Sequence, residues 1–466
     1  MNATRAKKMN ELKLLQDADE RARRYLENTR ERRVFPDSAA LDGLNAFDEV
    51  LPMAGNSEQS TLRLLDDAGS PATVASNGPN YFGFVIGATL PVAAAAERLA
   101  ISWDQCASSF DNSPVADKIE KVAARWILDA LDLPRDSAVG FGTSASACGL
   151  ACLTAARRAL LKRQGWDFDE HGLNGAPEIK VVVSDMVHIT VLKSLRMMGF
   201  GLANIVRAPV DANCRIDPAR LPPLDDKTIL CLQAGEVNTG EFDPFVPLID
   251  MARQAGAWVH VDGAFGLWAR ASESLKHMTE GVEAADSWTS DGHKWLNTPY
   301  DGAFSICREA DELSTAMNSD AVYSSASFDS QKNLGIEFSR RARGIAIWAA
   351  LRTLGRKGIG DMVDRHCAQA RRLADGLEMA GIKVLNRVVL NQVVARLEDD
   401  RATNNLRERA VQTGRVWFGP TVYAGRTAFR LSVSSWRTTD ADIDRAIAVL
   451  TDLVCGNGQE HQCNGP

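Results

Sequence analysis

Short strand-like runs alternate with helical segments between about Ser137 and Arg308, and this alternation limits the possible folds most strongly. The strand-like runs are nearly continuous in apolar residues, which is typical of strands that helices bury on both faces. The pattern therefore predicts an α/β layer with a mostly parallel sheet. The expected strands are Val181–Ser184, Ile205–Ala208, Thr228–Gln233, Trp258–Asp262, Ser287–Thr289 and Ala303–Cys307.

The pattern changes after Gly344, where long helices precede a few separated strands. A chain of 466 residues is long enough for two or three packed domains. We expect an N-terminal helical segment at residues 1–75, a large domain at 76–344 and a smaller α+β domain at 345–466. The expected C-terminal elements are helices at Ile345–Leu354, Asp361–Ala380 and Asp442–Val454 and strands at Ile382–Leu385, Gln392–Leu397 and Ala428–Val433.

The charge distribution argues against nucleic acid and membrane partners. The net charge is −7 and the basic residues are scattered, so there is no electrostatic footprint for nucleic acid. The residues from Met1 to Arg33 have the spacing of a helix with one apolar stripe and lack the apolar core of a signal peptide. The apolar stretch Val85–Ile101 is short for a bilayer and contains Pro91, which favours a buried helix. We expect a small-molecule substrate.

The cysteines indicate a reducing compartment. The chain has nine, with no CxxC pair and an odd total, so the sequence suggests neither a disulfide framework nor a zinc site. We expect a cytoplasmic protein without a bound metal.

Lys294 is the first candidate for catalysis. It follows the expected strand Ser287–Thr289 in the segment Ser290-Asp-Gly-His-Lys-Trp295. A lysine near the carboxyl end of a strand is suited to Schiff-base chemistry, because a neutral amine attacks a carbonyl. Taken alone, this segment fits a solvated surface lysine better.

Asp262 strengthens the case for Lys294. It ends the apolar strand Trp258–Asp262, where a carboxylate could pair with the pyridine nitrogen of pyridoxal 5′-phosphate (PLP) and keep the ring an electron sink. The alternative is a turn cap. One helix and a return strand fit between the two residues, so both can reach one cavity at the carboxyl edge of the sheet.

A third segment, Gly140–Leu150, is suited to binding a phosphate. It places Ser144, Ala145 and Ser146 at the expected start of a helix, where backbone N–H groups and the helix dipole attract anions. An ordinary helix cap is the alternative, which becomes less favoured once a lysine and an aspartate of the right kinds follow.

These segments resemble the group II PLP-dependent decarboxylases, a family that includes the aromatic-L-amino-acid, histidine and glutamate decarboxylases. The stretch Ala285–Trp295 is similar to the family's cofactor-lysine signature, and His260–Gly266 is similar to its aspartate strand. The resemblance covers most of the chain. It implies the PLP-dependent transferase fold of type I, which is the aspartate-aminotransferase-like fold. It also implies a homodimer with the active site at the interface.

The resemblance implies a role for each matching residue. Lys294 is the Schiff-base lysine, Asp262 pairs with the pyridine nitrogen, and His188 stacks on the cofactor ring. The segment Ala321–Ser325 resembles the family's catalytic loop, so Tyr323 is the expected proton donor. The expected cofactor contacts are Ser144, Ala145, Ser146, His188, Asp262, Ala264, His293 and Lys294, and the expected substrate contacts are Phe84 and Arg430.

The implied activity is decarboxylation of an L-amino acid to the amine and carbon dioxide. An aminotransferase or a carbon–carbon lyase of the same fold remains the alternative. The chain departs from the family pattern at Gly78, Ala147, Glu236 and Val237. Because several of these positions lie where the substrate is read, the substrate does not follow from the resemblance, and there is only a mild preference for an aromatic one.

Overall fold

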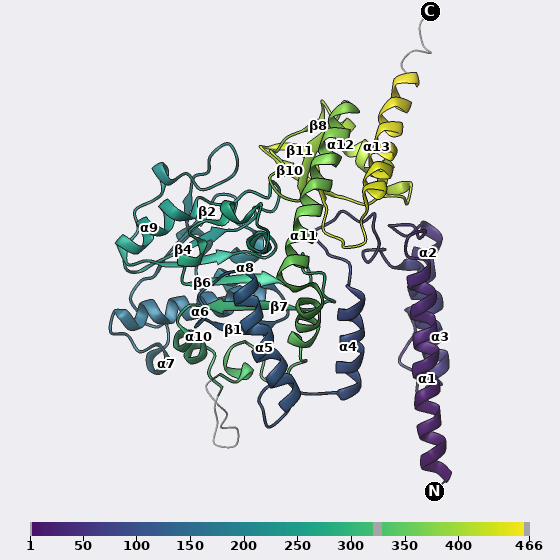
Figure 1. Cartoon of the computed structure of the whole chain (residues 1–466), viewed down its shortest axis with the longest axis horizontal. Coiled ribbons are helices and arrows are strands. Elements are labelled where there is room, and N and C mark those ends of the chain that lie inside the picture. The colour runs from purple at the N-terminus through teal and green to yellow at the C-terminus, as the bar shows by residue number, and fades with distance from the viewer. Residues whose placement is uncertain (1, 320–328, 461–466) are drawn as a thin grey trace, which may run out of the picture.

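The computed structural model describes residues 2–319 and 329–460, and a seven-stranded sheet forms its centre (Figure 1). The strand order is β1-β7-β6-β5-β4-β2-β3, and every pair is parallel except those that β7 makes with β1 and β6. The mostly parallel α/β sheet is therefore confirmed. The strands are Ala138–Gly142 (β1), Lys180–Ser184 (β2), Val206–Ala208 (β3), Thr228–Gln233 (β4), Trp258–Asp262 (β5), Ser287–Asp291 (β6) and Ala303–Cys307 (β7).

Strand β1 is the one strand of this sheet that the sequence pattern did not predict. Its glycines weaken a strand pattern. The fold needs a glycine at Gly140, because a Cβ there would lie 1.9 Å from the carbonyl oxygen of Leu334.

Helices bury the sheet on both faces. Val181 and Val183 of β2 belong to a core shared with α6 and α8, whereas Val182 belongs to a second core shared with α5 and α9. This alternation explains the continuous apolar runs, since neither face meets water. The helices are Pro114–Ala130 (α5), Ala145–Arg163 (α6), Phe168–His171 (α7), Ile189–Met197 (α8), Phe245–Ala255 (α9) and Ala310–Ala316 (α10).

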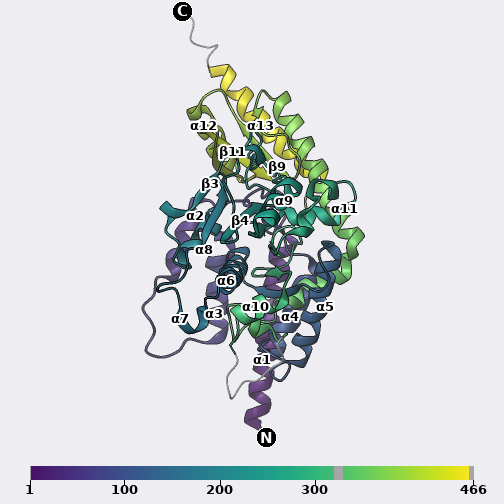
Figure 2. The same ribbon diagram turned by 90° about the vertical axis from the view of Figure 1, so that its left-hand side faces the viewer.

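A smaller antiparallel sheet, in the order β10-β11-β9-β8, lies at the C-terminal end of the molecule (Figures 1 and 2). Helix α11 connects it to the central layer and is interrupted at Gly355, between the two helices expected there. Helix α12 and strand β10 were not predicted. The division at residues 75 and 344 stays a prediction. The elements are Gly344–Met379 (α11), Lys383–Val384 (β8), Gln392–Arg396 (β9), Asp400–Gln412 (α12), Gly419–Tyr423 (β10), Arg426–Ser432 (β11) and Asp440–Glu460 (α13).

The N-terminal helices lie along one side of the molecule, where α1 and α3 run beside each other (Figure 1). A helix was expected within Val85–Ile101 and is present, but the expectation that it is buried is wrong in this chain. The helix spans Pro91–Trp103 (α4), packs on α11 and leaves Leu99 and Ile101 55% and 60% exposed. Across the part of the chain described, no helix has the length and apolarity to cross a bilayer. The remaining helices here are Asn2–Glu27 (α1), Ser38–Asp42 (α2) and Glu58–Leu64 (α3).

Short 3₁₀ helices and one π-helix occupy many of the connections. They are Gly43–Phe47 (η1), Leu65–Gly69 (η2), Ser70–Ala72 (η3), Leu202–Asn204 (η4), Pro218–Arg220 (η5), Gly266–Ala271 (η6), Lys276–Thr279 (η7), Val282–Ala284 (η8) and Gln331–Asn333 (η9).

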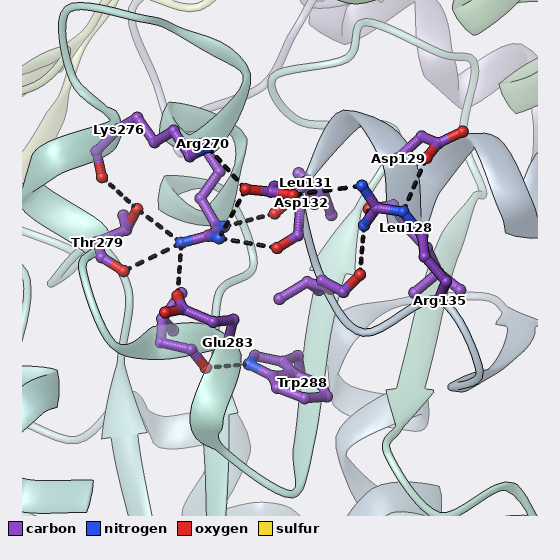
Figure 3. A network of polar contacts seen from close by, with 12 residues as sticks. Leu128, Asp129, Leu131, Asp132, Arg135, Arg270, Lys276, Thr279, Glu283 and Trp288 are labelled. Carbon is purple, nitrogen blue, oxygen red and sulfur yellow. Dashed lines mark hydrogen bonds and ion pairs between the residues drawn. The ribbon is translucent and has the colours of Figure 1, made fainter.

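A buried arginine in η6 joins the turn that follows α5 to the end of η7 (Figure 3). Arg270, only 3% exposed, donates to the carbonyl oxygens of Leu131 and Asp132 on one side and of Thr279 on the other. Its charge is balanced by Glu283 at 3.1 Å. One guanidinium therefore donates hydrogen bonds to backbone carbonyl groups of two segments, and these carbonyl groups would otherwise lack donors.

We expect Arg270→Met to lower the free energy of unfolding by about 3 kcal/mol, because the substitution leaves buried carbonyl groups without partners. The matched control is Lys276→Met, since Lys276 is 37% exposed and forms an ion pair with Asp132 in the same network. The control substitution should lower the free energy of unfolding by about 1 kcal/mol or less. Urea denaturation followed by circular dichroism measures both, and equal midpoints for the two variants would contradict the assignment.

Candidate active site

A cavity of about 300 Å³ opens at the carboxyl edge of the parallel strands. The backbone register aligns the ends of three strands, with Gln233 of β4 beside Asp262 of β5 and Asp262 beside Thr289 of β6. The sequence-predicted residues that line the cavity together are Phe84, Ser144, Ala145, Ser146, His188, Asp262, Ala264, His293, Lys294 and Arg430. Tyr323 lies outside the described residues.

Lys294 enters the cavity from the turn that follows β6. Its side chain is 22% exposed, and Nζ lies 3.3 Å from Oδ2 of Asp291. The segment around Gly87 crosses directly over this turn, because a Cβ on Gly87 would lie 2.1 Å from the carbonyl oxygen of Lys294. The close approach places Phe84, Val85 and Ile86 in the cavity wall.

Phe84 and Val85 adopt left-handed backbone conformations, with φ of 53° and 58°. Such angles are strained for residues with side chains and most of all for a β-branched valine. Strain of this kind persists where surrounding structure over-determines it, and it clusters at ligand sites.

An acidic side chain and a neutral imidazole line the cavity together with Lys294. Asp262 ends β5, and its Oδ1 accepts a hydrogen bond from the backbone N–H of Ala264 at 3.1 Å. His188 caps α8, and its Nδ1 lies 2.7 Å from Oγ1 of Thr190. Burial lowers the pKa of His188, with the charge of Asp262 opposing this effect, so the imidazole is neutral at pH 7.

The first turn of α6 borders the same cavity. Ser144 caps the helix, and its hydroxyl oxygen accepts from the N–H of Ala147 at 3.3 Å. Ala147 therefore serves the cap through its backbone. The N–H of Ala145 donates to Oδ1 of Asp291 at 2.6 Å.

Arg430 closes the side of the cavity nearest the small sheet. It extends from β11, and its Nη1 donates to the carbonyl oxygen of Val237 at 2.6 Å. Burial lowers the pKa of Arg430, and the neighbouring Glu236 opposes that shift. Glu236 accepts from the N–H groups of Asn238 and Thr239 at 2.9 and 2.7 Å. Glu236 and Val237, which depart from the family pattern, thus belong to a turn whose backbone carbonyl binds Arg430.

Several cavity residues were not predicted from the sequence motifs. Asp291 could have been noticed as a second acid three residues before Lys294. Gln233 could have been noticed as the polar residue that ends the predicted strand Thr228–Gln233, whereas Tyr300 carries no comparable signal. Tyr300 lies against the ring of His293, with centroids 4.4 Å apart.

The residues present fit PLP. The cavity offers an amine for the aldehyde at Lys294, a carboxylate for the ring nitrogen at Asp262, and a flat neutral ring at His188. The buried amide nitrogen of Gln233 faces this cavity wall without a hydrogen-bond partner among the described residues, as expected where a polar ligand belongs. Within residues 2–319 and 329–460, no three His, Cys, Asp or Glu side chains are grouped to hold a metal ion.

Comparisons with known proteins identify relatives of this chain. The pyridoxal-dependent decarboxylase conserved domain matches residues 45–397. The chain is 28% identical over 416 residues to tryptophan decarboxylase 1 of Oryza sativa subsp. japonica, which covers 80% of each chain. It is 28% identical over 335 residues to the aromatic-L-amino-acid decarboxylase of Bacillus atrophaeus, which covers 69% of this chain and 67% of that one.

A solved structure confirms the expected fold type. The crystal structure of Oryza sativa TDC with PLP and tryptamine superposes with a TM-score of 0.88 at 24% identity, covering 96% of this chain and 98% of that chain. The chain belongs to the pyridoxal-dependent decarboxylase family and is a PLP-dependent carboxy-lyase that acts on an amino acid.

Proposed function

We propose that this enzyme converts an aromatic L-amino acid to its amine, with PLP attached to Lys294. The observation that carries the proposal is the single cavity shared by Lys294, Asp262 and His188. Phe84 and its neighbours add an apolar wall, which suits an aromatic side chain better than a charged one. The two relatives named above bear the names of aromatic-substrate enzymes.

In this proposal each residue has one task at the cofactor. PLP supplies the electron sink for the charge that remains on the α-carbon once carbon dioxide has left. Lys294 holds the cofactor covalently. Asp262 would pair with the ring nitrogen and keep that nitrogen protonated, and His188 would offer a neutral flat surface for the ring without adding a competing positive charge.

The cavity lining also offers groups suited to the phosphate and to the substrate carboxylate. The first turn of α6, with Ser144, Ala145 and Ser146, binds the phosphate through helix N–H groups and hydroxyls. Arg430 binds the substrate carboxylate, and its anchor on the carbonyl of Val237 fixes the direction from which that carboxylate is held. The remaining cofactor contacts in the proposal are Ala264 and His293.

Tyr323 is proposed to donate the proton that completes the amine. This role follows from the family resemblance, and the residue lies outside the described residues. A positioned acid contributes roughly 10² to 10⁴ to a rate. Unchanged amine formation by Tyr323→Phe would contradict the role.

The proposed function is tested by incubating the purified protein and PLP with a panel of amino acids. We expect tryptophan, tyrosine or phenylalanine to release carbon dioxide and the matching amine at least about 10-fold faster than glutamate, histidine or lysine, because the apolar wall penalises a charged side chain. Mass spectrometry identifies the amines. A keto acid without carbon dioxide would indicate the aminotransferase alternative, and preference for glutamate would contradict the aromatic substrate.

The functional unit is proposed to be a cytoplasmic homodimer with the active site at the interface. In the single chain, Phe84 and Tyr300 line the cavity but remain 57% and 55% exposed. Leu99 and Ile101 of α4 are also exposed apolar side chains, which a partner subunit could cover. A second copy that covers these side chains would complete the cavity wall. A single-chain mass for the active enzyme by analytical ultracentrifugation would contradict the dimer.

A further inference from the structure

Asp291 occupies the place where a phosphate is expected to bind. It ends β6 and is only 2% exposed. Its Oδ1 accepts the N–H of Ala145 at 2.6 Å, and this N–H belongs to the first residue of α6. Its Oδ2 lies 3.3 Å from Nζ of Lys294. One buried carboxylate therefore contacts both groups through which the cofactor would be held.

The carboxylate and the phosphate need the same donor. A helix N-terminus attracts one anion through its free N–H groups and its dipole, and a charge-assisted hydrogen bond of 2.6 Å is a strong one. A phosphate bound between Ser144 and Ser146 would have to share Ala145 N–H with Asp291 or displace it. It would also bring a second negative group close to a carboxylate that water cannot screen well.

We propose that Asp291 competes with the cofactor phosphate for the N-terminus of α6 and thereby weakens the binding of PLP. This inference rests on the proposed function, because it requires PLP in this cavity. The same carboxylate forms the ion pair with Lys294, so displacing it also releases the amine that must bond to the cofactor. Asp291 is thus a positioning residue that sets how readily the enzyme gains and loses its cofactor.

The test compares dissociation constants for PLP in the wild type and Asp291→Asn, measured by titrating the cofactor-stripped protein and following the quenching of tryptophan fluorescence. Asparagine keeps the shape and an acceptor oxygen for Ala145 N–H but removes the negative charge. We expect PLP to bind about 10-fold more tightly to the variant. Asp301→Asn is the matched control, because Asp301 lies in the loop after Lys294 and pairs with Arg343 outside the cavity. It should leave the dissociation constant unchanged.

Pyridoxal, which lacks the phosphate, separates the two contacts of Asp291. If competition for the helix end is correct, Asp291→Asn tightens PLP binding far more than pyridoxal binding. An equal gain for both ligands would mean that Asp291 acts through Lys294, and it would overturn the proposal. An unchanged or weaker affinity for PLP in a variant that still binds pyridoxal as the wild type does would also overturn it. Failure of the wild type to bind PLP would instead overturn the proposed function.

Discussion

Replacing Lys294 by alanine is expected to abolish the visible absorbance of the bound cofactor and to lower decarboxylation by at least about 10⁴-fold. In the proposed function this amine bonds covalently to PLP, and covalent attachment together with orientation supplies several kcal/mol of a rate enhancement. The side chain extends into the cavity from the turn after β6. Replacing it by alanine therefore removes the amine from the cavity wall without disturbing the strand. A spectrum of the purified protein with PLP, recorded alongside an amine assay, measures both effects.

The matched control for this variant is Lys276→Ala. Lys276 is a partly exposed lysine that forms an ion pair with Asp132 and does not line the cavity. Its replacement should leave both the visible band and the rate as in the wild type. A visible band that survives in Lys294→Ala would exclude this lysine as the attachment point.

The residues at the carboxyl edge of the sheet could be predicted because the sequence pattern of each strand shows locally where that strand ends. Strands β4 and β5 are apolar runs that end in a polar residue, Gln233 and Asp262, and parallel strands end at the same edge. Placing candidates at strand ends therefore places them near one another. This explains why the predicted cofactor and substrate residues within the described part of the chain line one cavity.

The contact of Asp291 with α6 could not be predicted, because it joins residues 146 positions apart. Nothing in the local pattern distinguishes this acid from a turn cap. The same limit applies to Gln233, whose unpaired amide nitrogen becomes evident only when the packing around it is known.

Other misses have local causes. Strand β10 contains Pro420 and lies at the edge of its sheet, where proline is tolerated but weakens the strand pattern. Helix α12 buries only Thr403, Leu406 and Ala410, an apolar stripe too thin to stand out in a charged segment. The apolar residues of α4 suggested a buried helix, but composition does not reveal whether the chain itself or a second copy covers such a face.

Asp262→Ala is expected to lower kcat by roughly 10³-fold at saturating PLP, since removing one preorganised electrostatic partner of the developing charge costs roughly 4 kcal/mol at the upper end. Without the carboxylate, the ring nitrogen loses its proton more easily and the ring withdraws electrons less strongly. Lys294 is retained, so the visible absorbance of the bound cofactor should persist. Stopped assays of amine formation at several PLP concentrations separate the lower rate from weaker cofactor binding.

Two comparisons show whether the effect of this variant arises at the ring nitrogen. Asp185→Asn removes an exposed carboxylate just after β2, at the same edge of the sheet but outside the cavity lining, and it should leave kcat unchanged. Reconstituting Asp262→Ala with N-methyl-PLP, whose ring nitrogen carries a permanent positive charge, should recover part of the lost rate, because the cofactor then needs no carboxylate to stay cationic. If N-methyl-PLP gives no recovery while it still binds, Asp262 contributes through the shape of the cavity rather than through its charge.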